Sequence, residues 1–490
     1  MPDVIKARRP FIAGRWVEGD VPFSVTNPAD ESQVCVLPCT PPAEVRRAVA
    51  EARKSFDEGV WADCPAEHRA RVVGAFLDHL ESMRGELVPT MVAEAGQPTW
   101  FAETTQLDAG LALARATVGL YLSMAHEEAN QVPVDELVRG RVALSVRRYE
   151  PVGVVTAITP YNAALLMALQ KVVPALMAGN SVIVRPSPLT PLSSLALGSA
   201  AEAAGLPPGV LSVVVEDGAA GAELLTSDPQ VDLVSFTGST EVGRRILAQA
   251  APTVKRVALE LGGKSAQIYL PDALHRVGAG ATGVVAATAG QACVAATRML
   301  VPQEQREEVL ATVSATYSAL KVGPPTEPGT HLGPVISAQQ RARCERFVAL
   351  AQEHGGKVVA GGGRPAEPDR GYYFEPTVLD VPDNSNPAAR EEIFGPVLTV
   401  IGYRDLDDAV RIANDSSYGL SAQVYSSDAA AATAVARRIR SGAVNVNTSL
   451  FSAYAPSGGY KQSGLGRERG TEGIRAFQET KHMAIGELAR

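Results

Sequence analysis

The sequence predicts an α/β protein with two open, mostly parallel sheets. The first observation is a series of short, β-branched segments that begins near residue 146 and alternates with helical stretches. The second observation is a similar series after residue 262. Near-continuous apolar strands that alternate with helices are typical of parallel sheets covered on both faces. We therefore expect two α/β domains with a crevice between them.

The expected strands of the first series are "VGVVTAITP", "SVIVRPS", "VLSVVV" and "VDLVSFTG", and those of the second are "SAQIYL", "TRMLVP", "KVVAGG", "PVLTVIGY", "AQVYSS" and "AVNVN". Upstream, residues 11–38 alternate short apolar runs with turn residues, which is typical of hairpins. A helix with Thr40 as its N-cap is expected next, and amphipathic patterns over 65–95 and 99–127 predict two further long helices.

Composition bounds the class of protein. A chain of 490 residues is too long for one hydrophobic core, and 46% apolar with 20% charged residues is the profile of a soluble globular protein. A net charge of −8 argues against a nucleic-acid partner. The sequence shows no secretory signal and no run of about eighteen apolar residues, so we expect no membrane partner and a cytoplasmic location.

Cysteine and histidine usage excludes two further classes of site. The five cysteines are an odd number in a long chain, which argues against a disulfide framework. The seven histidines stand singly, without the spacing of a metal site. We therefore expect no bound metal.

A phosphate site is suggested by "VDLVSFTGSTEVGRRILAQA". This segment predicts a strand, a tight turn and a helix, with Gly238, Ser239 and Thr240 at the helix N-terminus, where free N–H groups suit a pyrophosphate. The segment lacks the GxGxxG pattern, so an ordinary strand–helix turn is the alternative. "LGGKS" resembles the end of a P-loop, but Ala258 stands where that motif requires glycine.

The thiol Cys293 lies in "AATAGQACVAATRM", where most neighbours are small. Such a cysteine is either a small core residue or a nucleophile that needs room for a substrate. Together with the thiol, Glu260 and Asn162 would form a sufficient set of catalytic groups for acyl chemistry, because an amide can stabilise an oxyanion and a carboxylate can activate water. Taken singly, the three residues also fit a core position, a helix-end acid and a turn.

Several motifs together carry a resemblance that covers nearly the whole chain. They are "TNPADESQVCVLP", "PYNAALLMALQKVVPALMAGNSVIVRPSPLTP", "GLPPGVLSVV", "FTGSTEVG", "ELGGKS", "GQAC", "EEIFGPVL" and "PSGGYKQSGLGRERG". In this order and spacing they resemble the aldehyde dehydrogenase superfamily. The resemblance implies a dinucleotide-binding domain (1–125 and 151–261), a catalytic domain (262–462) and a small β-rich element (126–150 and 463–490) that builds homodimers or homotetramers.

The resemblance also implies roles for individual residues. Cys293 takes the place of the nucleophile, Glu260 that of the general base and Asn162 that of the oxyanion donor, while Lys171 and Glu468 match a proton-relay pair. The thiol should be partly ionised, which amide dipoles and Lys171 would favour. The implied cofactor-binding residues are Ile158, Tyr161, Arg185, Ser187, Pro188, Gly218, Phe236, Gly238, Ser239, Glu260, Leu261, Gly262, Glu392 and Phe394.

The sequence departs from the family pattern near the adenosine ribose. Pro188 replaces a glutamate that would bind the ribose hydroxyls and repel a 2′-phosphate, and Arg185 could pair with such a phosphate. Glu216 and Asp217 in the next turn would act against that phosphate. We therefore expect NAD or NADP as cofactor, with NADP accepted.

The substrate tunnel departs as well, since several positions that carry aromatic rings in many members are small or polar here. Fewer rings predict a wider tunnel and a bulky, aromatic, cyclic or branched aldehyde. No Arg or Lys stands at the assigned positions, which disfavours a semialdehyde of a dicarboxylic acid. The assigned tunnel residues are Ala163, Met167, Gln170, Ala287, Ala292, Val294, Phe451 and Ser457.

The expected function is NAD(P)-dependent oxidation of a small-molecule aldehyde to its carboxylic acid, through a thiohemiacetal and a thioester on Cys293. Three alternatives remain open. A relative that binds but does not turn over would have lost the thiol or the base, and both are present. A dehydrogenase that transfers the acyl group to coenzyme A generally lacks the glutamate found at Glu260. A semialdehyde dehydrogenase is the third.

Overall fold

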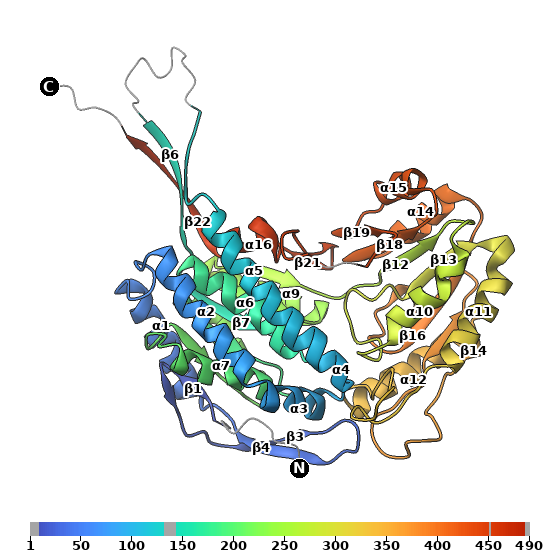
Figure 1. Ribbon diagram of the computed structural model, residues 1–490, viewed down its shortest axis with the longest axis horizontal. Coiled ribbons are helices and arrows are strands. Elements are labelled where there is room, and N and C mark those ends of the chain that lie inside the picture. Colours follow the sequence, from blue (N-terminus) through green and yellow to red (C-terminus); the bar gives the residue numbers. More distant parts are fainter. Residues whose placement is uncertain (1–8, 132–143, 450–451, 486–490) are drawn as a thin grey trace.

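The computed structural model describes residues 9–131, 144–449 and 452–485. The chain forms two large sheets with helices on their faces and a separate three-stranded sheet (Figure 1). The expected α/β class is confirmed, and the strands at the centre of both large sheets are parallel.

The first sheet has eight strands, with parallel pairing from β9 to β11 and antiparallel strands at its edges. In spatial order the strands are β2 (Arg15–Trp16), β1 (Phe11–Ile12), β9 (Leu211–Val213), β8 (Ser181–Arg185), β7 (Val154–Ile158), β10 (Leu233–Thr237), β11 (Arg256–Glu260) and β21 (Gly464–Leu465). All residues of β7, β8 and β10 are buried, as expected for strands covered on both faces.

The order of the strands places a ligand crevice. The chain runs from β7 outward to β8 and β9, then returns to the other side of β7 to form β10 and β11. Ligands bind at such a switch point, outside the carboxyl ends of the strands. The register aligns Ile158 with Arg185 and Phe236, and Thr237 with Glu260, so residues far apart in sequence meet at one edge.

Nine α-helices accompany this sheet in the described part of the chain: α1 (Pro42–Asp57), α2 (Ala66–Ser82), α3 (Arg84–Ala95), α4 (Thr99–Phe101), α5 (Gly110–Ser123), α6 (Ala164–Ala178), α7 (Leu192–Ala203), α8 (Ala220–Ser227) and α9 (Thr240–Ala250). A π-helix, Ala102–Ala109, joins α4 to α5. The expectation that Thr40 caps α1 is wrong. Pro41 is the N-cap, and the Thr40 hydroxyl accepts a hydrogen bond from the Val215 N–H at 2.9 Å.

The second sheet follows directly. Its seven strands are, in spatial order, β14 (Lys357–Ala360), β15 (Thr377–Asp380), β16 (Val397–Tyr403), β13 (Arg298–Pro302), β12 (Ala266–Tyr269), β18 (Ser421–Tyr425) and β19 (Ala443–Val446). The accompanying helices are α10 (Val277–Val285), α11 (Arg306–Ser318), α12 (Ala338–Glu353), α13 (Pro387–Arg390), α14 (Leu406–Asn414) and α15 (Ala429–Ala436). "LGGKS" links β11 to β12, so it joins the two sheets instead of opening a helix as a P-loop does.

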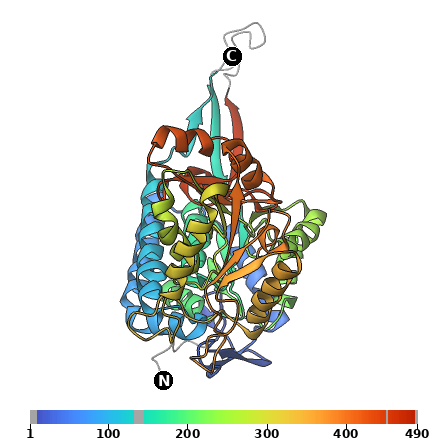
Figure 2. The same cartoon turned by 90° about the vertical axis from the view of Figure 1, so that its right-hand side faces the viewer.

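The third sheet consists of β22 (Gln478–Ile485), β6 (Leu144–Pro151) and β5 (Glu127–Ala129), all antiparallel. Figures 1 and 2 show β6 and β22 leaving the body of the molecule as a narrow arm. The end of the chain is not confined to this arm, because β21 extends the first sheet and α16 (Gly470–Arg475) lies beside α5 and α6. The domain boundaries given above stay a prediction.

Two short pairs complete the strands: β3 (Pro22–Thr26) with β4 (Gln33–Pro38), and β17 (Tyr418–Gly419) with β20 (Tyr460–Lys461). All five cysteines are free thiols. Within residues 9–131, 144–449 and 452–485, no helix has the length and apolar character needed to cross a bilayer. The same residues contain no cluster of His, Cys, Asp or Glu able to hold a metal ion.

Candidate active site

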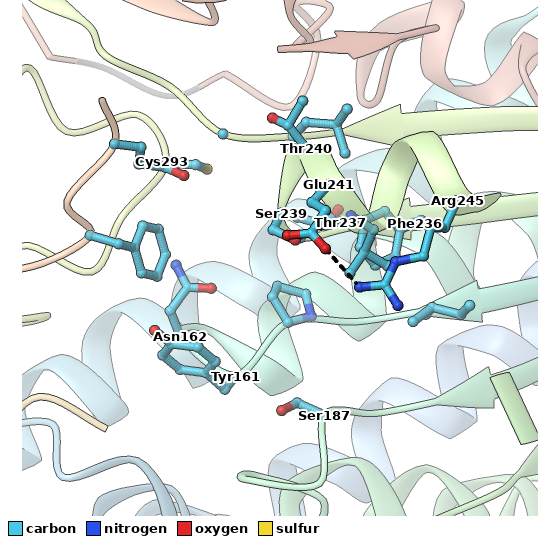
Figure 3. A pocket seen from close by; sticks show the side chains of 18 of the residues that line it. Tyr161, Asn162, Ser187, Phe236, Thr237, Ser239, Thr240, Glu241, Arg245 and Cys293 are labelled. Carbon is cyan, nitrogen blue, oxygen red and sulfur yellow. Dashed lines mark hydrogen bonds and ion pairs between the residues drawn. The ribbon is translucent and has the colours of Figure 1, made fainter. Parts of the chain in front are cut away.

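A cleft of about 1280 Å³ lies between the two large sheets and joins the expected cofactor residues to the thiol. Asn162 and Cys293 both line it, and Figure 3 shows them facing the same hollow from different segments. Of the expected cofactor residues, Glu260 does not line the cleft. Those that do are Ile158, Tyr161, Arg185, Ser187, Pro188, Gly218, Phe236, Gly238, Ser239, Leu261, Gly262, Glu392 and Phe394.

The N-terminus of α9 opens onto this cleft. Ser239 is the N-cap, and its hydroxyl accepts a hydrogen bond from the Val242 N–H at 3.3 Å. Glycine is required just before it, because a Cβ on Gly238 would lie 2.4 Å from Cζ of Phe236. The backbone N–H groups and the positive end of the helix therefore face the cavity, as an anionic group such as pyrophosphate needs.

The Cys293 loop is held in a strained conformation between α10 and β13. Ala287, Ala289 and Gly290 all have left-handed backbone angles, with φ of 69°, 48° and 72°. A Cβ on Gly290 would lie 2.1 Å from the Gly395 carbonyl oxygen, so only glycine fits where the two segments meet. A non-glycine residue in this region costs about 1–2 kcal/mol, and such strain persists where the surrounding structure fixes a functional loop.

The Gly262–Gly263 turn lies between the thiol and a carboxylate. A Cβ on Gly263 would lie 2.3 Å from the carbonyl oxygen of Cys293, and one on Gly262 would lie 2.5 Å from Oε2 of Glu392. The Gly263 N–H donates to Oε1 of Glu392 at 2.9 Å. Ser463, fully buried, donates its hydroxyl to the Gly262 carbonyl at 2.7 Å. The turn thereby fixes the spacing between Cys293 and Glu392.

Gln291 is a positioning residue that the sequence analysis did not single out as functional, although it belongs to the "GQAC" motif. Its backbone carbonyl accepts a hydrogen bond from Nδ2 of Asn162 at 2.8 Å. Its buried side-chain oxygen accepts from the Tyr161 hydroxyl at 3.3 Å and from the Ile336 N–H at 3.0 Å. Gln291 therefore fixes the expected oxyanion donor relative to the thiol loop.

Phe394 packs edge-to-face on Tyr161, with ring centroids 5.9 Å apart. Its backbone is left-handed, with φ of 60°, which is unusual for an aromatic residue. Gln340 stabilises this conformation by donating to the Phe394 carbonyl at 2.7 Å. These contacts hold the Phe394 ring on the wall of the cleft, between the N-terminus of α9 and the thiol.

Glu260, Lys171 and Glu468 lie behind this wall, in the protein interior. Nζ of Lys171 forms an ion pair with Glu468 at 2.5 Å and donates to the Ser235 hydroxyl at 3.2 Å. Glu260 is only 9% exposed, and a Cβ on Gly458 would lie 2.7 Å from its Oε1. The structure thus brings the three expected proton-handling residues into one buried group.

The described tunnel residues are divided between the thiol loop, α6 and the segment before α16. Ala163, Met167, Gln170, Ala292, Val294 and Ser457 are half-buried, whereas Ala287 is buried beneath the thiol loop. Phe451 lies outside the described residues. With its amide oriented to satisfy both ends, the side-chain oxygen of Gln170 accepts hydrogen bonds from the guanidinium of Arg469 at 2.9 and 3.1 Å. A cation therefore contacts one of the assigned tunnel positions.

Comparison with known proteins agrees with this geometry. The model of the aldehyde dehydrogenase family matches residues 16–483. The chain belongs to the aldehyde dehydrogenase family. Geranial dehydrogenase of Castellaniella defragrans is 39% identical over 97% of this chain and 98% of its own length.

Solved aldehyde dehydrogenases share the fold across almost the whole chain. Aldehyde dehydrogenase C of Pseudomonas syringae, a cysteine-to-alanine mutant solved with NAD+ and octanal, superposes with a TM-score of 0.92 at 37% identity and covers 98% of this chain and 96% of that one. Betaine aldehyde dehydrogenase of Staphylococcus aureus, solved as a point mutant with NAD+ and a modified cysteine, gives a TM-score of 0.93 at 34% identity, with 97% and 95% covered.

The thiol of this aldehyde dehydrogenase is neutral in the resting site. Burial, together with the nearby acids Glu392, Glu260 and Glu468, raises the pKa of Cys293 to about 12, because a thiolate would add a negative charge among them. The Val294 N–H lowers this pKa, as expected of an amide dipole, but burial and the nearby acids outweigh it. Lys171 is committed to Glu468.

The acid beside the thiol is also perturbed. Burial raises the pKa of Glu260 well above its ordinary value, and Glu468 adds to the effect, while Lys171 and the nearby arginines oppose it. A raised pKa makes the carboxylate a stronger proton acceptor than a solvated glutamate. The raised pKa therefore suits Glu260 to the role of a general base.

Arg185 does not reach out as the sequence suggested. Its Nε donates to Oε1 of Glu216 at 2.8 Å, and its other nitrogens donate to the carbonyls of Pro186 and Gly218. Glu216 in turn accepts from the N–H groups of Gly221 and Ala222 at the start of α8. The Arg185 guanidinium of this aldehyde dehydrogenase is therefore already paired with Glu216 before a ligand binds.

The raised pKa predicts how Cys293 responds to alkylation. Iodoacetamide should react with it about tenfold faster per pH unit from about pH 7 to about pH 9, without levelling off, because only the thiolate attacks. Mass spectrometry of the Cys293 peptide measures the rate, with the half-buried Cys64 outside the cleft as internal standard. A plateau below about pH 8 would contradict the neutral resting thiol.

Proposed function

We propose that this aldehyde dehydrogenase oxidises a small-molecule aldehyde to its carboxylic acid with NAD or NADP, through a covalent intermediate on Cys293. The observation that carries the proposal is the shared cleft, which is lined by Cys293, Glu392, Phe394 and the N-terminus of α9. A dinucleotide with its pyrophosphate at α9 would have its ribose beside Glu392. When bound there, the nicotinamide supplies a hydride acceptor.

The first step is addition of the thiol to the aldehyde. The sulfur forms a bond to the carbonyl carbon, the thiol proton passes to Glu260 directly or through water, and the oxygen becomes an oxyanion. An amide has two N–H donors, of which Asn162 uses one for the Gln291 carbonyl. The second can donate to the oxyanion, together with the backbone N–H of Cys293.

The second step is hydrolysis. Loss of hydride from the thiohemiacetal gives a thioester, and a water molecule then attacks its carbonyl carbon. Glu260 takes a proton from that water, and the carbon–sulfur bond breaks to release the acid and restore the thiol. The Lys171–Glu468 pair, 2.5 Å apart and adjacent to Glu260, would relay the thiol proton of the first step outward before hydrolysis. The proton that Glu260 then takes from water passes to the departing sulfur.

We infer that the substrate is a bulky aldehyde, since small or polar residues occupy tunnel positions on α6 and beside the thiol. We also infer a cytoplasmic homodimer or homotetramer. The arm formed by β5, β6 and β22 supports the oligomer, because a projecting sheet presents unpaired strand edges that a second copy can cover.

Pre-steady-state kinetics test the chemical proposal. With NAD and a panel of aldehydes, the wild type should form NADH continuously, and Cys293→Ala should form none while still binding NAD. Glu260→Gln should slow hydrolysis more than the first hydride transfer, so that NADH appears in a burst of at most one per site. Later turnovers should be at least about a hundredfold slower, since general-base catalysis contributes that much or more.

The exposed acid Glu307 on α11 offers a matched control, because Glu307→Gln removes the same charge far from the cleft and should show no burst. The product should remain the free acid when coenzyme A is added. A coenzyme A thioester as main product, or full turnover by Cys293→Ala, would contradict the proposal.

We propose that NADP is accepted, because Pro188 carries no carboxylate to repel a 2′-phosphate. The Arg185–Glu216 pair works against a preference for NADP, so Glu216→Gln should raise the NADP-to-NAD ratio of kcat/KM by about tenfold, the value of one charge-assisted contact. Glu223→Gln, an exposed acid of the same cleft, should leave the ratio unchanged. A wild-type preference for NAD above about a hundredfold would contradict acceptance of NADP.

A further inference from the structure

Helix α6 has one accessible strip. Its residues are buried along the whole helix, which the structure describes throughout, except at Met167 and Gln170. These two residues and Pro174 follow each other at spacings of three and four, so they lie on one face of the helix. The face begins next to Asn162, which lines the cleft with Cys293. We take this face as the route along which a substrate bound at the thiol would extend.

Gln170 ends this route at a cation. In the orientation that satisfies both ends of its amide, the Gln170 oxygen accepts from Nη2 of Arg469 at 2.9 Å and from Nε at 3.1 Å. The two side chains line a hollow of about 20 Å³ together with apolar residues of α5, α6 and α16, helices that lie together in Figure 1. The hollow has room for about one water molecule, the space that the tip of a small polar group needs.

Arg469 lies within electrostatic reach of the reacting residues. Burial lowers its pKa, whereas Glu468, Cys293 and Glu260 raise it by favouring the positive charge. A guanidinium stays charged through such changes. The charge of Arg469 therefore acts on the thiol and on Glu260, and its side chain contacts the half-buried face of α6 at Gln170.

The charges around this hollow favour an anion. Glu468, the acid next to Arg469 in sequence, is already paired with Lys171. Arg467 adds a further positive charge that acts on Glu260, and Glu260 itself holds its proton more tightly than a solvated glutamate. Arg469, Arg467 and Lys171 thus lie among two acids, of which Glu468 is paired and Glu260 has a raised pKa.

We propose that Arg469, oriented by Gln170, binds a carboxylate at the end of the substrate opposite the aldehyde. The proposal rests on the function proposed above and narrows its substrate to aldehydes that carry a carboxylate, aliphatic or aromatic. A guanidinium recognises a carboxylate through two parallel N–H donors, which a neutral chain end cannot accept.

The sequence alone pointed away from such a substrate, because it placed no cation at the tunnel. Arg469 follows the expected relay acid Glu468 directly, and only the fold brings its side chain to Gln170. Arg469 is therefore proposed as a specificity-determining residue, not as part of the hydride-transfer machinery.

Matched substrate pairs test the proposal with the full-length enzyme and saturating NAD. The pairs are para-carboxybenzaldehyde with para-methylbenzaldehyde, and adipic semialdehyde with hexanal. The wild type should prefer the carboxylate in at least one pair by about tenfold or more in kcat/KM, expressed mainly in KM, since one charge-assisted contact is worth that factor. Arg469→Gln should bring the ratio to about one, and Arg469→Lys should restore part of it.

Arg475→Gln is the matched control. It removes a charge of α16 whose guanidinium donates to the side-chain oxygen of Gln478 and the carbonyl of Ala125, and it should keep the wild-type ratio. A wild type that turns over both members of both pairs equally would overturn the inference and leave the proposed function standing. An unchanged ratio in Arg469→Gln would overturn it as well. Absence of turnover with all four aldehydes would contradict the proposed function, and the inference with it.

Discussion

The close approach of the Gly262–Gly263 turn to the Cys293 loop is the constraint on which the site depends. The turn leads from β11 of the first sheet to β12 of the second, and it passes between the backbone of the thiol and the carboxylate of Glu392. A Cβ on Gly263 would collide with the Cys293 carbonyl oxygen, and one on Gly262 would displace the Glu392 carboxylate. The crevice at the carboxyl ends of β7 and β10 and the loop before β13 therefore face one cavity. The spacing of cofactor and nucleophile follows from the backbone, before any side chain contributes.

Burial then sets the chemistry of that cavity. The same low-dielectric surroundings raise the pKa of Cys293 and of Glu260, so the resting site holds a neutral thiol beside a strong proton acceptor. Such an arrangement suits a nucleophile that ionises only when a carbonyl is in place to receive it. The left-handed backbone at Ala289 orients the thiol loop, and that at Phe394 orients its ring. Each conformation costs conformational free energy that the packing around it must offset.

Sequence patterns predicted what depends on local chemistry. The buried strands and the helix start at Gly238, Ser239 and Thr240 were accessible because hydrophobic period and turn type follow from neighbouring residues. Contacts between distant segments were not. The Arg185–Glu216 pair, the Arg469–Gln170 pair and the neutral state of Cys293 each depend on packing that no single stretch encodes. The cap of α1 failed for the same reason, since Thr40 bonds a strand far along the chain.

The most direct test of the central constraint is a single-turnover measurement on Gly263→Ala, with hydride transfer and the Kd for NAD read on the same sample. The added Cβ should push the Cys293 carbonyl away from the turn that binds Glu392. Hydride transfer should therefore slow by about a hundredfold, the effect of a displacement near one ångström, and NAD binding should weaken as well. Gly283→Ala on α10, where a Cβ meets open space, serves as the reference. A Gly263→Ala enzyme that matches this reference in both quantities would contradict the account.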